Sequence, residues 1–261
     1  MVFQIEGAQK TNCVILAIVG SGNVGTALYD VFSAVAEVNC IHWYSKTPNE
    51  GQLFFDYHIP AEVDLVFLAI PDGEIDHLAG KLLLQSEATI VVHLSGATSS
   101  SVLAKYFHNF GVFYPVQTIR KGATLNWIEI PICIHGNEES LEKIYKLAET
   151  ISNNARFLGD EARLYLHLGA VMVNNFTNHL AVLTKDFLEN KNVEFALLNA
   201  IIKESALKLT QESPDFTQTG PAKRKDYATI SRHEALLNND VELLKLYSII
   251  TESIINYYHK K

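Results

Sequence analysis

A glycine-rich turn near the N-terminus has the spacing of a dinucleotide-binding site. The apolar run Val14–Val19 leads into Gly20-Ser21-Gly22-Asn23-Val24-Gly25, and a helical pattern of small residues follows. In such a turn the first glycine permits the bend out of the strand, the second lets a pyrophosphate approach bare backbone, and the third lets helix and strand pack closely. Helix N–H groups and the helix dipole then hold the phosphates. We therefore predict that residues 20–25 bind a dinucleotide.

The end of the second predicted strand indicates which dinucleotide binds. An acidic residue about 20 positions beyond the glycines would bind the ribose hydroxyls of NAD. The strand Asn39–Tyr44 runs instead into Tyr44-Ser45-Lys46-Thr47, which contains no carboxylate. A hydroxyl followed by a cation suits a 2'-phosphate, so we expect Tyr44, Ser45 and Lys46 to bind NADP rather than NAD. The alternative is that Ser45 and Lys46 are ordinary turn residues.

The third predicted strand ends in Ala69-Ile70-Pro71-Asp72. Ligands of open α/β sheets bind at the carboxyl ends of the strands. We therefore expect the backbone of Ala69, Ile70 and Pro71 to lie beside the ribose and nicotinamide end of the dinucleotide. The Asp72 side chain is expected to cap the helix that follows.

The fourth predicted strand leads into Ser95-Gly96-Ala97-Thr98-Ser99. Ser95 and Gly96 are expected to lie at the nicotinamide, where Ser95 orients the substrate or the carboxamide. The alternative is a plain strand-to-helix turn in which Thr98 or Ser99 is the N-cap.

Two further segments carry candidate substrate-binding residues. Gln117 and Thr118 follow the next strand, where they line the substrate side or only satisfy a bend. The polar loop Thr217–Asp226 contains Gly220-Pro221 and Arg224. Arg224 is a candidate clamp for a substrate carboxylate or phosphate, whereas a solvated connection is the alternative.

The helical pattern from Asp160 carries a polar stripe. At about 100° per residue, His167, Val171, Asn174 and Asn178 share one narrow face. The histidine side chain ordinarily ionises near neutral pH, so His167 is a candidate proton donor or acceptor, with Asn174 or Asn175 holding the substrate. Hydrogen bonds between helices are the alternative role for these polar groups.

Alternating strand and helix signals in the first half predict an α/β fold with a doubly wound parallel sheet. The strand-like runs are Val14–Val19, Asn39–Tyr44, Asp64–Ile70, Thr89–Leu94, Gly111–Tyr114 and Ile130–His135. The helices expected between them are Gly25–Ala36, Glu74–Gln85, Ser99–Phe107 and Glu138–Ile151.

Beyond about residue 160 the strand signal stops and the apolar residues keep helical spacing. Helices are expected over Asp160–Leu188, Val193–Glu212 and Val241–Tyr258. We predict a dinucleotide-binding Rossmann domain over residues 1–155 and an all-helical substrate or dimerisation domain over residues 156–261. The long helices carry more apolar residues than one small domain easily buries, so we expect a homodimer through the helical domain.

Composition limits the remaining classes of function. The chain has 261 residues, a net charge of −8 and 48% hydrophobic residues, which indicates folded domains without a basic face for nucleic acid. No apolar run reaches the roughly 18–20 residues that span a bilayer, and no signal sequence is evident, so we expect a cytoplasmic protein. Three widely spaced cysteines indicate buried thiols, and no metal site is expected.

Several of these segments together resemble one family. They are Gly20 to Gly25, Ala69 to Asp72, His93 to Ala97, Tyr114 to Thr118, Arg163 to His167 with Asn174-Asn175-Phe176, and Gln218 to Pro221 with Arg224 and Asp226. Over nearly the whole chain they look like the Rossmann-like family with a C-terminal domain of unknown function. Members are commonly labelled NADP oxidoreductases, and some are labelled deazaflavin-dependent.

Wider relatives of this family are the 6-phosphogluconate dehydrogenase-like group, with 3-hydroxyisobutyrate dehydrogenases and pyrroline-5-carboxylate reductases. This resemblance implies a helical dimerisation domain and a site between domains. Hydroxyacid dehydrogenases of the group use a lysine one helical turn before an asparagine. If Asn175 takes the asparagine position, Val171 takes that of the lysine, and valine cannot donate a proton. His167, one helical turn earlier, is the alternative proton donor.

The sequence therefore favours an NADP-dependent oxidoreductase that transfers hydride between the nicotinamide and a small carbonyl, imine or alcohol. An imine reductase resembling pyrroline-5-carboxylate reductase, which needs no such lysine, is one form of this prediction. The alternative from another class is a non-catalytic, NADP-binding redox-sensing or regulatory protein.

Overall fold

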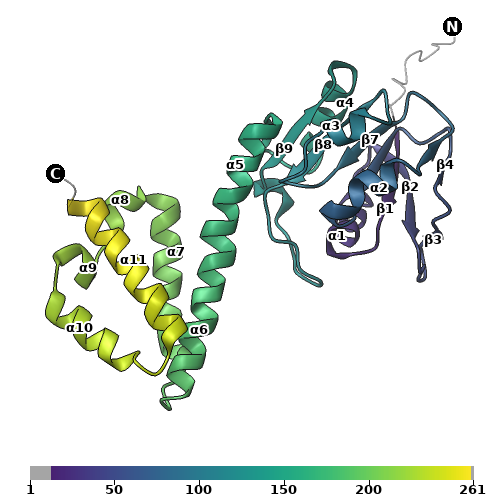
Figure 1. Ribbon diagram of the computed structural model, residues 1–261. Coiled ribbons are helices and arrows are strands. Elements are labelled where there is room, and N and C mark those ends of the chain that lie inside the picture. Colours follow the sequence, from purple (N-terminus) through teal and green to yellow (C-terminus); the bar gives the residue numbers. More distant parts are fainter. Residues whose placement is uncertain (1–12, 260–261) are drawn as a thin grey trace, which may run out of the picture. The chain divides into compact units, whose positions relative to one another are not determined.

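The computed structural model describes residues 13–259, and its first half alternates strands with helices as the sequence predicts. Figure 1 shows this α/β part and the helical part that follows it. The predicted fold class, a Rossmann-type sheet followed by helices, is confirmed.

The main sheet has eight strands in the order β10-β9-β8-β7-β5-β1-β2-β3. Two further short strands pair with each other away from it, β4 (His58–Ile59) and β6 (Leu83–Leu84). The strands of the main sheet are β1 (Val14–Val19), β2 (Val38–Ser45), β3 (Leu53–Phe54), β5 (Leu65–Leu68), β7 (Ile90–His93), β8 (Phe110–Pro115), β9 (Ile132–Gly136) and β10 (Ala155–Phe157).

One strand direction differs from the prediction of a parallel sheet. Strand β9 runs antiparallel to β8, with Phe113 opposite Ile134. Between them lies only a loop with the 3-10 turn η2 (Trp127–Glu129), and parallel neighbours need a longer crossover, usually a helix. Helix α4 (Glu138–Glu149) supplies such a crossover after β9, so β10 pairs parallel to β9.

Helices cover both faces of the sheet because its central strands alternate their side chains between two apolar cores. Leu16 and Ile18 of β1 face the core with α1 (Asn23–Phe32) and α4. Ala17 and Val19 face the opposite core, with α2 (Ile75–Ala79) and α3 (Ser101–Ala104). This two-residue period is the doubly wound arrangement that positions ligands at the carboxyl edge of the sheet.

Two compact units divide at residue 173, the first running to Val173 and the second starting at Asn174. Helix α5 (Asp160–Ala170) belongs to the first unit, because its Asp160 carboxylate accepts hydrogen bonds from Ser99 and Ser100 beside the sheet. The functional division expected at residue 155 stays a prediction.

The second unit contains helices and no strand among its described residues. A π-helical segment, η3 (Val171–Phe176), joins α5 to α6. The later helices are α6 (Thr177–Glu189), the 3-10 turn η4 (Phe195–Leu198), α7 (Asn199–Gln211), α8 (Pro214–Thr217), α9 (Pro221–Arg224), α10 (Tyr227–Leu236) and α11 (Val241–His259). The predicted loop 217–226 thus includes the short helix α9, and its Asp226 caps α10 by accepting a hydrogen bond from Thr229 N–H.

The three cysteines differ in their burial. Cys133 is buried as expected, but Cys13 and Cys40 are exposed, so the prediction of buried thiols is wrong for those two. None of the described helices combines the length and apolar character needed to cross a membrane.

Candidate functional site

The glycine turn between β1 and α1 has the geometry of a dinucleotide cradle. Gly20 has a φ of +122°, and a Cβ there would lie 2.1 Å from the carbonyl oxygen of Ala69. A Cβ on Gly25 would lie 2.2 Å from the carbonyl oxygen of Gly20. Around Gly22, in contrast, no described atom lies within 4 Å of the Cβ position. The protein's own packing therefore requires glycine at 20 and 25 but leaves the space at 22 open.

Backbone and side-chain hydrogen bonds hold this turn against β2. The Gly20 N–H donates to the Tyr44 carbonyl oxygen at 3.0 Å, and Trp43 Nε1 donates to the Gly20 carbonyl oxygen at 3.0 Å. The Ser21 and Ser45 hydroxyls lie 3.0 Å apart. The turn and the end of β2 thus form one rigid edge.

A cavity of about 450 Å³ opens at this edge. Of the predicted cofactor residues it is lined by Gly20, Ser21, Tyr44, Ser45, Lys46, Ile70 and Pro71. Its other polar lining residues, which were not predicted as cofactor contacts, are Thr47, Tyr57, Glu74 and His77. Glu74 and His77 are three positions apart, and residues three apart are neighbours on a helix surface. The helical pattern after Pro71 could therefore have predicted that both lie on one face.

Ser45 and Lys46 differ in what they offer a ligand. The Ser45 side chain is buried, and its hydroxyl accepts a hydrogen bond from Thr47 N–H at 3.2 Å. Lys46 is exposed beside it, at the cavity. Ser45 therefore organises the turn, and Lys46 is the cation available to a phosphate.

A second hollow, of about 700 Å³, lies on the other side of the turn. Ser21, Gly22 and Asn23 face it together with Arg120 and Lys121 from the loop between β8 and β9. Asn23 Nδ2 donates to the Ile119 carbonyl oxygen at 3.4 Å, which connects that loop to the start of α1. Val24 and Ala69, also predicted to contact the cofactor, pack their side chains against the apolar core.

Asp72 and Ser95 pair with each other at the ends of neighbouring strands. The Ser95 hydroxyl donates to Asp72 Oδ2 at 2.6 Å and accepts from the N–H groups of Ala97 and Thr98. The prediction that Asp72 caps a helix is wrong, because neither the 3-10 turn η1 (Asp72–Glu74) nor α2 has a side-chain cap, and the Asp72 carboxylate accepts from Ser95 instead. Ser95 is held in place by three hydrogen bonds at the edge where the nicotinamide was expected.

The alternative N-cap role is observed in part for Ser99. Helix α3 has Ser100 as its N-cap residue, but the Ser99 hydroxyl accepts a hydrogen bond from Ser101 N–H at 3.2 Å. Asp160, distant in sequence, adds to this local bond by accepting from Ser100 N–H at 2.9 Å. Burial raises the pKa of Asp160, but hydrogen bonds from Ser99, Arg163 and Ser100 outweigh it and bring the pKa to about 2.

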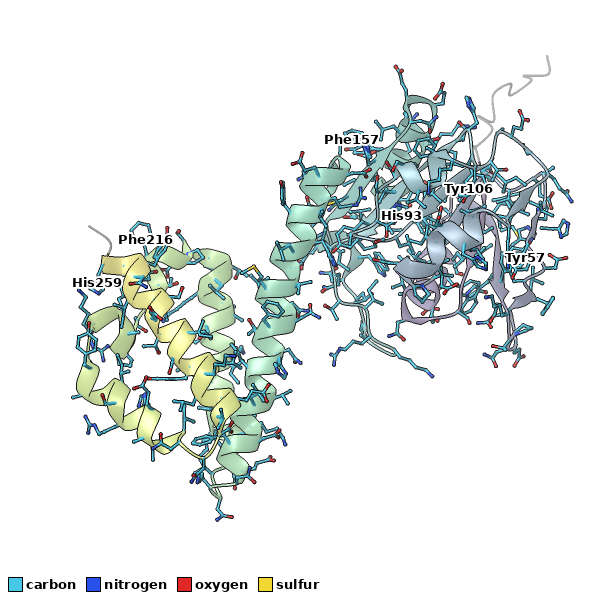
Figure 2. The ribbon with its side chains drawn as sticks, in the orientation of Figure 1. Tyr57, His93, Tyr106, Phe157, Phe216 and His259 are labelled. Carbon is cyan, nitrogen blue, oxygen red and sulfur yellow. The ribbon has the colours of Figure 1, made fainter. Side chains whose placement is uncertain are left out.

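Arg163 and His93 lie buried beneath this edge, and Figure 2 shows His93 inside the sheet-containing unit. Arg163 pairs with Asp160 Oδ1 at 2.8 Å and donates to the Thr98 carbonyl oxygen. His93 Nδ1 accepts from Ser95 N–H at 3.2 Å. Burial, reinforced by the Arg163 charge, lowers the pKa of His93 to about 4, so this ring is neutral at physiological pH.

His167 contacts the same edge from α5. Its Nδ1 lies 3.1 Å from the Tyr114 hydroxyl at the end of β8. Both rings pack against Gly96, where a Cβ would lie 2.6 Å from His167 Nδ1. The structure thus brings together Ser95, Gly96 and His167 of the predicted residues, and adds Tyr114 and Asp72.

The remaining predicted residues follow β8 or belong to the second unit. Gln117 and Thr118 are exposed, and Gln117 Oε1 accepts from Thr118 N–H at 2.9 Å. Asn174 and Asn175 are exposed at the start of the second unit, with Asn174 Nδ2 3.4 Å from Asn175 Oδ1. Arg224 is exposed at the end of α9. Their roles stay predictions.

The π-helical segment changes the spacing on which the polar stripe was predicted. Val171–Phe176 follows an i to i+5 hydrogen-bond pattern, so residues beyond it are rotated relative to a 100° periodicity. The relation of Val171 to Asn175 also lies within this segment. A stripe calculated for a regular α-helix therefore does not describe residues 167–178, and π segments are often found at functional sites.

Known structures share this architecture over nearly the whole chain. The putative NADP oxidoreductase BF3122 from Bacteroides fragilis is 27% identical, with a TM-score of 0.82, covering 95% of this chain and 100% of its own. A reductive aminase from Aspergillus terreus, in complex with NADPH and ethyl levulinate, is 16% identical, with a TM-score of 0.63 and coverages of 95% and 100%. A 1-pyrroline-5-carboxylate reductase from Streptococcus pyogenes is 12% identical, with a TM-score of 0.57 and coverages of 94% and 99%.

No curated protein matches the sequence. A family model does match residues 130–254, from just before β9 to within α11. The matched model describes a domain of unknown function, DUF2520. This match and the structural neighbours confirm the resemblance that the sequence indicated, and the chain carries a DUF2520 domain in its C-terminal region.

Proposed function

We propose that this protein is an NADP-dependent oxidoreductase that transfers hydride between the nicotinamide and a small carbonyl, imine or alcohol. The observation that carries the proposal is the open space at Gly22. Contacts within the protein require glycine at positions 20 and 25, whereas no contact with the described residues requires glycine at position 22. A pyrophosphate that approaches the backbone accounts for it.

The cofactor of this proposal is NADP(H). Structural neighbours described as an NADP oxidoreductase and as an NADPH complex support the NADP prediction. In this chain Lys46, which lines the cavity, supplies a positive charge for a 2'-phosphate. No carboxylate occupies residues 44–47, where NAD-binding sites place one.

The polar cluster at the adjoining strand ends would orient the reactants. The bound cofactor would supply the hydride, and the protein would supply orientation and proton exchange. The Ser95 hydroxyl already donates to Asp72 and accepts from the N–H groups of Ala97 and Thr98, so in this structure it would hold the turn beside the nicotinamide, and direct contact with the substrate or the carboxamide stays a prediction. His167 is suited to exchange a proton with the substrate heteroatom, and Asn174, Asn175 and Arg224 remain predicted substrate contacts.

Calorimetric titration with NADPH and with NADH tests the cofactor assignment. We expect NADPH to bind more tightly than NADH, and Lys46→Ala to weaken NADPH about tenfold, since one charge-assisted contact is worth roughly 1.5–3 kcal/mol. The affinity for NADH should not change. Lys143→Ala on α4, an exposed lysine away from the cavity, is the matched control. Binding of neither nucleotide would contradict the proposal.

We further propose that the protein is a homodimer through its helical unit. Large apolar side chains remain exposed on this unit, including Leu197 (73%), Ile201 (58%) and Phe216 (83%). Exposed apolar area of this extent indicates an interaction surface. Sedimentation at low micromolar protein concentration should show a dimer that Ile201→Glu dissociates. Wild-type protein that sediments only as a monomer would contradict this part.

A further inference from the structure

Tyr114 and His167 are joined by a hydrogen bond as well as by contact between their rings. The Tyr114 hydroxyl lies 3.1 Å from His167 Nδ1, and the two rings meet edge to face with centroids 6.0 Å apart. Both residues belong to the first unit, Tyr114 on β8 and His167 on α5.

Gly96 provides the space in which this pair meets. A Cβ at position 96 would lie 2.6 Å from His167 Nδ1 and 2.7 Å from Tyr114 Cζ. Both rings therefore rest on bare backbone directly after the turn that carries Ser95. The pair therefore packs directly against the backbone that follows β7, at the carboxyl edge of the sheet.

The hydrogen bond at Nδ1 determines which nitrogen of the neutral ring carries hydrogen. A neutral imidazole has one donor and one acceptor nitrogen, and the partner of one nitrogen fixes the state of the other. A phenol is a stronger acid than a neutral imidazole N–H and therefore the better donor. With Tyr114 donating to Nδ1, the hydrogen of the ring resides on Nε2.

The surroundings keep Tyr114 in its protonated, donating form. Burial raises the pKa of Tyr114, with further contributions from Cys133 on β9 and from Asp72. Arg163 on α5 acts in the opposite direction without reversing the shift. Tyr114 thus keeps its proton at physiological pH and is available as a hydrogen-bond donor.

We propose that Tyr114 is a positioning residue, which holds His167 in the Nε2–H tautomer and presents Nε2–H to the oxygen or nitrogen of the substrate. The contact of Nε2–H with a substrate rests on the proposed function. The hydrogen bond and the tautomer of His167, however, can be measured without cofactor or substrate. A donor from Nε2 would polarise a carbonyl or imine group towards hydride acceptance.

Nitrogen NMR of protein labelled with 15N-histidine tests the assignment directly. The two ring nitrogens of a neutral imidazole have separate shifts for the protonated and unprotonated states, and His167→Gln identifies the signals of His167. We expect wild-type His167 to be a single Nε2–H tautomer with a hydrogen-bonded Nδ1. In Tyr114→Phe, Nδ1 should lose its hydrogen bond and the ring should populate both tautomers.

Tyr106→Phe is the matched control, because it also removes a tyrosine hydroxyl, one that donates to Asp76 Oδ1 at 3.2 Å. It should leave the His167 signals unchanged, and thermal unfolding verifies that both variants are folded. An Nδ1–H tautomer in the wild type, or identical His167 signals in wild type and Tyr114→Phe, would overturn the proposal. With a substrate in hand, Tyr114→Phe should lower kcat about tenfold at unchanged KM. Calorimetry with NADPH tests the proposed function, and the NMR signals of His167 test this inference. Failure of one can therefore be distinguished from failure of the other.

Discussion

Substitution of Gly22 by alanine should separate cofactor binding from protein stability. No described atom lies within 4 Å of a Cβ at this position, and its φ of −75° and ψ of −174° suit alanine. Loss of backbone freedom in the unfolded chain stabilises such a variant by about 0.4–1 kcal/mol. Because alanine is a poorer N-cap than glycine for α1, that gain is offset. The free energy of unfolding should therefore stay within about 0.5 kcal/mol of the wild-type value.

The affinity for NADPH should change much more. The new methyl group would occupy the space where the pyrophosphate approaches, so we expect at least a tenfold loss, about 1.4 kcal/mol of binding free energy. Gly25→Ala is the matched control, since its Cβ would lie 2.2 Å from the Gly20 carbonyl oxygen. Overpacking there should cost about 1–3 kcal/mol of stability and lower Tm by roughly 2–4 °C per kcal/mol.

Thermal unfolding and calorimetric titration of both variants provide the test. Wild-type affinity for NADPH in a folded Gly22→Ala variant would refute the reasoning, because the open space at Gly22 would then not be the approach of the pyrophosphate. A strongly destabilised Gly22→Ala variant would contradict the packing part of the argument.

Further outcomes follow from the buried groups and from Val171. Asp160→Asn should destabilise the protein by about 3 kcal/mol in chemical denaturation, because it leaves the buried Arg163 without its counterion; a loss below about 0.5 kcal/mol would count against a structural ion pair. The Asp160 pKa of about 2 is below its unfolded value, so its contribution to stability is present above about pH 4 and is lost as the pH falls towards 2. The His93 pKa of about 4 is also below its unfolded value of about 6.5, so stability should fall as the pH drops from 6.5 to 4. His93→Asn should flatten that part of the unfolding profile, and an unchanged slope would disprove the assignment. Because Val171 cannot act as a proton-donating lysine, NADPH oxidation assays should show reduction of cyclic imines, and NADP+ reduction assays should show no oxidation of hydroxyacids; the opposite preference would contradict this substrate class.

Local signals made the sheet and the glycine turn predictable. Apolar runs bounded by turn residues located six of the eight strands of the main sheet, and the bounds Val14–Val19 agree with β1. The two short strands at the ends of the sheet, β3 and β10, were not predicted. The direction of β9 was not predictable in the same way, since it depends on whether the preceding connection forms a crossover helix. The π-helical segment after α5 leaves no comparable signal in apolar spacing.

Polar partners that are distant in sequence explain the errors at the site. Asp72 looks like a cap locally, but Ser95, 23 positions away, occupies its carboxylate. The N–H of Ser100 donates to the carboxylate of Asp160, which lies 60 positions away in the sequence. The residues around a strand end were predictable from topology, whereas their pairing depends on packing that one sequence does not reveal.

Hydrogen–deuterium exchange with and without NADPH tests the central claim most directly, because it locates the dinucleotide on the chain. The account predicts protection of the glycine turn, residues 20–26, and of the end of β2 with its turn, residues 44–47. Peptides from α7 should exchange equally in both states. Tight NADPH binding that protects neither segment, or no binding at all, would contradict the assignment of this edge of the sheet as the cofactor site.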